Sequence, residues 1–347
     1  MNLNLNLNRD PGEEVRTADP EPETAAAEPS AVEAAPDDAL TAPRAREQKL
    51  QERGGPGRDG ELRRHSELHR RSRIIRSDLA HILCALSTLI AMIPLVLILF
   101  YVIYQGAGAL NLDFITQLPK PVGEPGGGMG NAIVGSLMLM GIAAVIGLPV
   151  GVLAGTFLAE FRSPRLSWFV RLLADILSGV PSIIVGVFVY TLLVLTFKQF
   201  SALAGGLALA ILMLPTVART TEEMLRMVPD SLREASLALG IPRWRTIISV
   251  IIKTAGGGIM TGVMLAIARI AGETAPLLFT ALNSRTWPTG IDKPVASLPV
   301  QIYQYAISPF DAWHQQAWAG SLVLVLMVLI LSVGSKLYFG RKMQRAR

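Results

Sequence analysis

The sequence predicts an all-α membrane protein with six transmembrane helices. Of its 347 residues, 51% are hydrophobic, and the mean hydropathy is +0.42. The stretch from Leu79 to Tyr104 is almost wholly apolar, and residues 322–331 are apolar throughout. Apolar runs of about 20 residues match the hydrocarbon thickness of a bilayer. Helices that cross a membrane therefore explain the composition better than soluble domains do.

Six apolar segments with the length of a membrane span follow one another along the chain. The predicted spans are residues 79–104, 132–158, 177–197, 203–219, 255–282 and 317–339. Residues 165–178 are expected to lie along the membrane interface before span three, with Arg171 and Asp175 spaced to form an i,i+4 ion pair. Glycines and prolines interrupt spans three and four, which is tolerable where neighbouring helices or a water-lined path satisfy the backbone.

The two ends of the chain differ from this transmembrane domain, which is expected to cover residues 79–340. Residues 1–50 are rich in Ala, Pro and Glu with a net charge near −6, and residues 51–78 turn basic. The sequence therefore predicts a disordered tail over residues 1–78, acidic and then Arg-rich. The opening MNLNLNLN has neither a positive region nor an adjoining apolar core, so no signal peptide is predicted. Residues 341–347 form a basic C-terminus.

Lys and Arg are distributed unevenly between the two sides of the predicted spans. One side carries 19 of them, in residues 59–78, 159–171, 217–247 and 334–347. The other side carries 4, in residues 105–131, 198–202 and 283–317. This asymmetry predicts that both termini and the connection 220–250 are cytoplasmic. Because the basic residues cluster beside apolar spans, they are expected to contact anionic lipid rather than nucleic acid.

The connection between spans four and five, Ser231 to Ile252, has the pattern of a helical hairpin. Ser231 and Glu234 have the spacing of a capping box. Gly240 can end the first helix in the left-handed conformation, and Pro242 suits the first turn of the second. A polar hairpin of this kind is typical of an element held by a soluble partner, although an ordinary cytosolic loop is the alternative.

Span five carries Arg269 and Glu273 one helical turn apart inside an apolar run. Charge at that depth is costly and usually faces a cavity, a partner or a counter-ion. Either the two residues neutralise each other, or Arg269 meets an anion in passage. Arg219, near the cytoplasmic end of span four, is a second candidate, although cytoplasmic placement alone would explain an arginine there. Thr274 could supply a hydroxyl donor.

No catalytic motif accompanies these charges. The sequence has no HExxH, no GxSxG and no P-loop, and the GGGMG at residues 126–130 lacks a following Gly-Lys-Ser/Thr. The single cysteine, Cys84, excludes a disulfide framework and a cysteine metal site. We therefore expect no enzyme activity, no bound cofactor and no ATP hydrolysis by this chain itself.

The hairpin resembles the EAA loop of ABC-importer permeases. Glu234, Ala235 and Ser236 are followed after three residues by Gly240, with serine in place of the second alanine, and the closing proline of the pattern is missing from Val250–Lys253. The segments RTTEEMLRMVPDSLREASLALG and TGVMLAIARIAGETAPLLFTAL resemble PstA-type permease subunits of the phosphate-specific ABC importer. GGGMGNAIVGSL and SLPVQIYQYA do so too, and the likeness covers about residues 79–340.

The resemblance implies a type I importer permease (MetI-like) fold, with the EAA hairpin as cytoplasmic coupling helices. It implies a PstC-type second permease, a PstB-type ATPase homodimer that uses ATP and Mg, and a periplasmic PstS-type phosphate-binding protein. The ATPase would hold the hairpin at Glu234, Ala235, Ser236 and Gly240. Phosphate would pass along the interface between the two permeases, where the candidate residues are Arg269, Glu273, Arg219 and Thr274.

Two alternatives stay open at this point. The chain could belong to an ABC importer for another anion, such as sulfate, molybdate or an organic anion. It could also be a stand-alone secondary transporter, a class that often shows inverted repeats. No repeat relates spans one to three with spans four to six.

Overall fold

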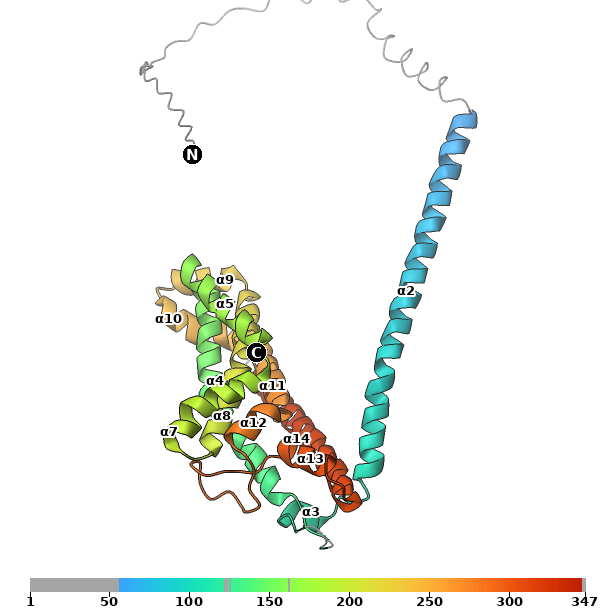
Figure 1. The fold of residues 1–347 in the computed structure, drawn as a ribbon. Coiled ribbons are helices and arrows are strands. Elements are labelled where there is room, and N and C mark those ends of the chain that lie inside the picture. Colours follow the sequence, from blue (N-terminus) through green and yellow to red (C-terminus); the bar gives the residue numbers. More distant parts are fainter. Residues whose placement is uncertain (1–55, 122–123, 125, 162, 345–347) are drawn as a thin grey trace, which may run out of the picture. The chain divides into compact units, whose positions relative to one another are not determined.

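The computed structural model describes residues 56–121, 124, 126–161 and 163–344, with side chains from Ser77 to Leu337 (Figure 1). The described residues form helices and connecting turns, and none of them is in a β-strand. The chain divides into two units, Met1–Leu86 and Ser87–Arg347. Helix α2 (Pro56–Gly106) contains all the described residues of the first unit and continues into the second.

The start of α2 corrects one prediction. Residues 56–78 were expected to belong to a disordered tail, but they are helical. Their arginines, leucines and glutamates have high helix propensity, so the basic segment continues the apolar helix without a break. The predicted span 79–104 lies inside α2, and the part of the predicted tail at residues 1–55 lies outside the described residues.

The second unit is built from helices of very different length. Short helices occupy the connections, and two π-helical turns, η2 and η3, interrupt longer ones. After α2 the order is α3 (Leu112–Thr116), α4 (Gly130–Glu160), α5 (Pro164–Gly179), α6 (Ser182–Val189), η2 (Tyr190–Val194), α7 (Leu195–Phe197), α8 (Ala202–Arg226), α9 (Asp230–Ala238), α10 (Arg243–Thr246), η3 (Ile247–Ile251), α11 (Ile252–Ala271), α12 (Ala275–Thr280), α13 (Leu298–Ala306) and α14 (Asp311–Gln344).

Five described helices are long and apolar enough to cross a membrane, and a bent pair can count as the sixth span. The five are Ser77–Gly106, Gly130–Glu160, Ala202–Arg226, Arg243–Ala271 and Asp311–Leu337. The pair is Pro164–Gly179 with Ser182–Phe197, bent by 103° where Pro181 precedes α6. This agrees with the six predicted spans but changes their bounds. Span four continues to Arg226, and span five begins at Arg243 and ends at Ala271 rather than Leu282.

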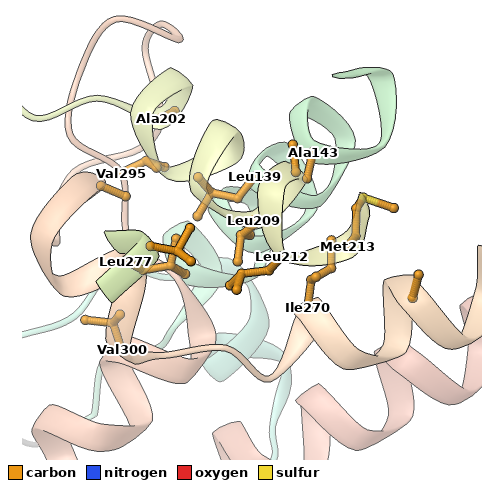
Figure 2. Close-up of a cluster of buried hydrophobic side chains, with 14 of the residues drawn as sticks. Leu139, Ala143, Ala202, Leu209, Leu212, Met213, Ile270, Leu277, Val295 and Val300 are labelled. Carbon is orange, nitrogen blue, oxygen red and sulfur yellow. The ribbon is translucent and has the colours of Figure 1, made fainter. Parts of the chain in front are cut away.

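Helix α8 lies at the centre of the second unit, between α4 and α11 (Figure 1). Figure 2 shows the buried cluster around it, with Leu139 from α4, Leu209 and Met213 from α8, Ile270 from α11 and Leu277 from α12. These apolar side chains fix the helices that carry the charged residues discussed below.

Glycines bring the neighbouring helices close to both sides of α8. On α4, a Cβ at Gly147 would lie 2.7 Å from Met213, and one at Gly151 would lie 2.8 Å from Val217. On α11, a Cβ at Gly262 would overlap Thr220. Small residues at four-residue spacing allow this close approach of helix backbones in a membrane. Helices α4 and α11 therefore both pack closely against α8.

Candidate functional site

The hairpin between α8 and α11 consists of α9, a tight turn and α10. Figure 1 shows α9 and α10 at the end of the second unit where α5 also lies. Gly240 has a φ of +74°, its N–H donates to the Leu237 carbonyl at 2.9 Å, and the Ile241 N–H donates to the Ser236 carbonyl at 3.2 Å. These two bonds make a Schellman motif, which ends a helix at a left-handed residue. The predicted conformation of Gly240 is thus confirmed.

The start of the hairpin differs from the prediction. Helix α9 begins at Asp230 after Pro229, and no side chain caps it, so the capping box of Ser231 and Glu234 is wrong. Pro229, whose ring fixes φ at −58°, is the N-cap instead, two positions before Ser231. Pro242 likewise stands just before α10 rather than inside its first turn.

The predicted docking residues do not all lie on one face of the hairpin. Glu234, Ala235 and Gly240 are exposed, whereas Ser236 is buried. Leu239 in the turn is 79% exposed, so an apolar side chain accompanies Glu234 on the outer surface. We call the surface formed by the exposed residues Glu234, Ala235, Leu239 and Gly240 the outer face of α9. It combines a carboxylate with an apolar side chain and is accessible in the isolated chain.

Arg233, the residue before Glu234, faces α4 and α8 rather than solvent and was missed in the sequence. Its guanidinium forms an ion pair with Glu160, the last residue of α4, at 2.8 Å, and a second with Asp230 at 2.9 Å. It also donates to the carbonyls of Leu225 and Val228. The hydrogen bond to Glu160 is the largest influence that raises the pKa of Arg233 above its usual value. No local sequence pattern indicates this ion pair, because Glu160 is 73 positions away from Arg233.

A second group of ion pairs joins α5 to α8. The carboxylate of Glu222 accepts from Arg171 at 2.8 Å and from Arg226 at 2.8 Å. Arg219 pairs with Asp175. The i,i+4 pair predicted between Arg171 and Asp175 is therefore wrong: both side chains point to α8, where each finds an opposite charge. Arg219, a candidate for the transport pathway, carries a counter-ion.

Arg269 lies in the last turn of α11 and is exposed. Among the described residues, no hydrogen bond or ion pair to the side chain of Arg269 or Glu273 is found, so the two do not form the neutralising pair considered above. The helix ends at Ala271, so Glu273 lies beyond it rather than one turn along it.

The break after α11 has a local cause. Pro276 stands in the first turn of α12, where its missing N–H costs nothing, but it would interrupt a helix that continued from α11. Thr274 precedes α12, and its hydroxyl donates at 3.4 Å to the Gly272 carbonyl. Glu273 and Thr274 are partly buried in this break. The structure thus separates the three candidate residues of span five into a helix end and an adjoining loop.

Within the described residues, no group of three His, Cys, Asp or Glu side chains could hold a metal ion. The charged groups that the structure places near helix ends are instead ion pairs and single exposed charges.

Comparisons with known proteins match most of the chain. The profile of the family described as binding-protein-dependent transport system inner membrane component matches residues 147–343. The phosphate transport system permease protein PstA of Yersinia pestis is 46% identical over 283 residues, which cover 81% of this chain and 95% of that relative. The protein with the same name from Haemophilus influenzae is 48% identical over 258 residues, 74% of this chain and 91% of the relative.

A solved structure shares the fold. A chain of the bacterial alginate ABC transporter, crystallised with its alginate pentasaccharide-bound periplasmic protein, superposes with a TM-score of 0.55 at 15% identity. The match covers 76% of this chain and 94% of that one. At this identity the likeness concerns the fold alone, and it confirms the predicted architecture of an ABC-importer permease.

Proposed function

Because the chain belongs to the family of binding-protein-dependent inner membrane transport components, and within it to the PstA-type permeases, we propose that it forms half of the transmembrane pathway of an ATP-driven importer of inorganic phosphate. A PstC-type permease forms the other half. A PstB-type ATPase homodimer uses ATP and Mg on the cytoplasmic side, and a PstS-type periplasmic protein delivers phosphate. The chain itself is not an enzyme.

One observation supports the passage of an anion more than any other: Arg269 is exposed and has no protein counter-ion among the described residues. It belongs to the apolar helix Arg243–Ala271, and a lone charge in such a helix is stable only if it faces water, a partner or a charged solute. The planar guanidinium binds oxyanions through two parallel hydrogen bonds. Arg269 therefore suits a pathway for phosphate at the interface with the second permease.

The neighbouring candidates have distinct roles in this proposal. Glu273 and Thr274 lie partly buried in the loop that follows Arg269, where a carboxylate limits how tightly the anion is held and a hydroxyl can donate to it. Arg219 is paired with Asp175, so an anion at this position would have to share the guanidinium with that carboxylate. Arg219 would therefore hold phosphate more weakly than Arg269.

In this proposal the hairpin connects the permease to the ATPase. The outer face of α9, with Glu234, Ala235 and Gly240 exposed, is the surface offered to the ATPase, and the buried Ser236 supports it from within. A left-handed turn at Gly240 keeps this surface compact. The excess of Lys and Arg on this side of the spans supports a cytoplasmic location for the hairpin and both termini, with anionic lipid beside them.

The substitution Arg269→Gln tests the pathway. In the complex with the two permeases, the ATPase and the binding protein, we expect phosphate uptake to fall at least about tenfold, since a hydrogen bond to a charged group contributes about 1.5–3 kcal/mol. Uptake of radiolabelled phosphate into proteoliposomes measures this, and co-purification of all subunits shows that assembly is intact.

The matched control is Arg165→Gln, which removes an exposed arginine for which no partner is found among the described side chains. It should leave uptake unchanged. Normal uptake by the assembled Arg269→Gln complex would remove this residue from the pathway. Competition of unlabelled sulfate or molybdate with labelled phosphate in the unsubstituted complex would instead point to an importer for another oxyanion.

A further inference from the structure

All five N–H groups of the Arg233 guanidinium have acceptors. Nε donates to the two carboxylate oxygens of Glu160 at 3.3 and 3.4 Å. Nη2 donates to Glu160 at 2.8 Å and to the Leu225 carbonyl at 2.9 Å. Nη1 donates to the Val228 carbonyl at 2.7 Å and to Asp230 at 2.9 Å. A guanidinium has five donors in a fixed plane, so this one is saturated.

One acceptor, Asp230, belongs to α9 itself, and the other three belong to different segments. Glu160 is the last residue of α4, Leu225 lies in the last turn of α8, and Val228 lies in the connection to α9. The final carbonyls of a helix lack a full set of intrahelical donors and carry partial negative charge, so a cation is stable there. Arg233 therefore attaches α9 at one point to the cytoplasmic ends of both α4 and α8.

The contacts of Arg233 lie next to the outer face of α9, on the side of the helix that faces α4 and α8. Glu234 is the next residue in the chain and is exposed, whereas the Arg233 side chain is 20% exposed and that of Glu160 only 10%. Adjacent residues of a helix point about 100° apart, so one faces outward and the other faces the membrane helices. A displacement of Glu234 would therefore be transmitted to α4 and α8 through the contacts of Arg233.

We propose that Arg233 is the positioning residue through which a displacement of α9 reaches α4 and α8, with Glu160 as its partner. This rests on the proposed function, because it assumes that an ATPase moves the outer face of α9. Arg233 touches neither ATP nor the solute. It fixes the angle between the hairpin and the membrane helices, so that α4 and α8 move when the hairpin moves.

A lysine could not replace this arginine fully. An ammonium group has three donors around one nitrogen and cannot bind the Glu160 carboxylate side-on while it also reaches Leu225 and Val228. Comparison of Arg233→Lys with the native arginine therefore separates the effect of charge from the effect of geometry. If charge alone mattered, Arg233→Lys would restore function; if the fork geometry matters, it restores function only in part.

The experiment compares Arg233→Gln, Arg233→Lys and Glu160→Gln in the reconstituted complex. Radiolabelled phosphate uptake and ATP hydrolysis are measured in the same proteoliposomes, and co-purification reports ATPase binding. We expect Arg233→Gln to bind the ATPase and hydrolyse ATP while phosphate moved per ATP falls about tenfold, within the usual range of coupling between two sites. Glu160→Gln should change the ratio in the same direction, and Arg233→Lys should lie between.

Glu234→Lys serves as the contrasting variant, because it changes the outer face and should abolish ATPase co-purification. If the ATPase still bound that variant, or if the unsubstituted complex moved no phosphate, the proposed function would fail rather than this inference. Arg165→Gln controls for the loss of one cytoplasmic arginine and should keep the ratio unchanged.

Two outcomes would overturn the proposal. An unchanged ratio of phosphate to ATP in the assembled Arg233→Gln complex would show that displacement reaches α4 without this residue. A parallel loss of assembly, hydrolysis and uptake in both Arg233→Gln and Glu160→Gln would show that the pair only stabilises the fold.

Discussion

At the scale of single residues, one carboxylate near the end of α8 is shared by two arginines. Glu222 keeps its carboxylate 11% exposed between Arg171 of α5 and Arg226 of α8. A buried charge that loses one partner is costly, because desolvation of the remaining group is no longer offset. Glu222 therefore contributes to the attachment of α5 to α8, together with the Arg219–Asp175 pair.

Replacing Glu222 with Gln should destabilise this region. The amide keeps the shape but loses the charge that both arginines require, and we expect a cost of about 1.5–3 kcal/mol, the usual contribution of hydrogen bonds to charged groups. The midpoint of thermal unfolding of the detergent-solubilised complex measures it.

The neighbouring Glu223 provides the control, because it is exposed and no partner is found for it among the described side chains. Glu223→Gln removes the same charge one position along the chain and should leave the unfolding midpoint nearly unchanged. Equal shifts for the two variants would contradict the role assigned to Glu222.

At the scale of helices, the contact between α4 and α8 depends on glycines of α4. A Cβ at Gly155 would overlap the Ala218 carbonyl oxygen, and backbone cannot move aside as a flexible side chain can. Gly141 belongs to the same helix, but a Cβ there would meet nothing within 4 Å. The two glycines thus differ in packing while they share the same helical environment.

Gly155→Ala should lower the stability of the complex by about 1–3 kcal/mol, the usual cost of overpacking a filled interior. Gly141→Ala should be neutral or slightly stabilising, since alanine is favoured over glycine by about 1 kcal/mol within a helix. Unfolding midpoints and the yield of assembled complex distinguish the two. A stable Gly155→Ala complex would mean that α4 and α8 can separate without loss.

The sequence predicted the existence of the spans well, because apolar runs of bilayer length need no tertiary information. It also predicted the left-handed turn at Gly240, since few other residues adopt that conformation. It failed where a local signal competed with packing. Arg171 and Asp175 have helix-pair spacing, yet each is closer to an opposite charge on α8.

The ends of helices were predicted less well than their centres. Apolar character continues through Gly272 and Pro276, so a hydropathy pattern alone extended span five past the break after Ala271. The role of Arg233 could not be predicted, because its partner Glu160 is brought near only by the folding of α4 against α8. Among the candidate site residues, Arg269 is predicted from the rarity of charge in a span, and its role in transport stays a prediction.

At the scale of the whole molecule, the distribution of Lys and Arg assigns a side to every connection. Leu239 in the turn after α9 is expected to face the cytoplasm, and Thr289 in the connection between α12 and α13 is expected to face the periplasm. Both side chains are exposed, so a chemical probe can reach them.

Single cysteines at these positions test the topology. In a Cys84→Ser background, a membrane-impermeant maleimide should label Thr289→Cys in intact spheroplasts and Leu239→Cys only after lysis. Labelling before and after lysis, followed by gel mobility, gives the result. The reverse pattern would invert the orientation and place the outer face of α9 away from any cytoplasmic ATPase.

The glycine contacts on both sides of α8 have a mechanical consequence. A Cβ at Gly155 of α4 would overlap the Ala218 carbonyl oxygen and one at Gly262 of α11 would overlap the Thr220 side chain, so both helices pack closely against α8. Arg233 attaches the hairpin to the ends of α4 and α8. Arg269 lies in the last turn of α11, whose 20 residues rise about 30 Å. Under the proposed function, a tilt of these helices at the hairpin end would move Arg269 sideways within the membrane.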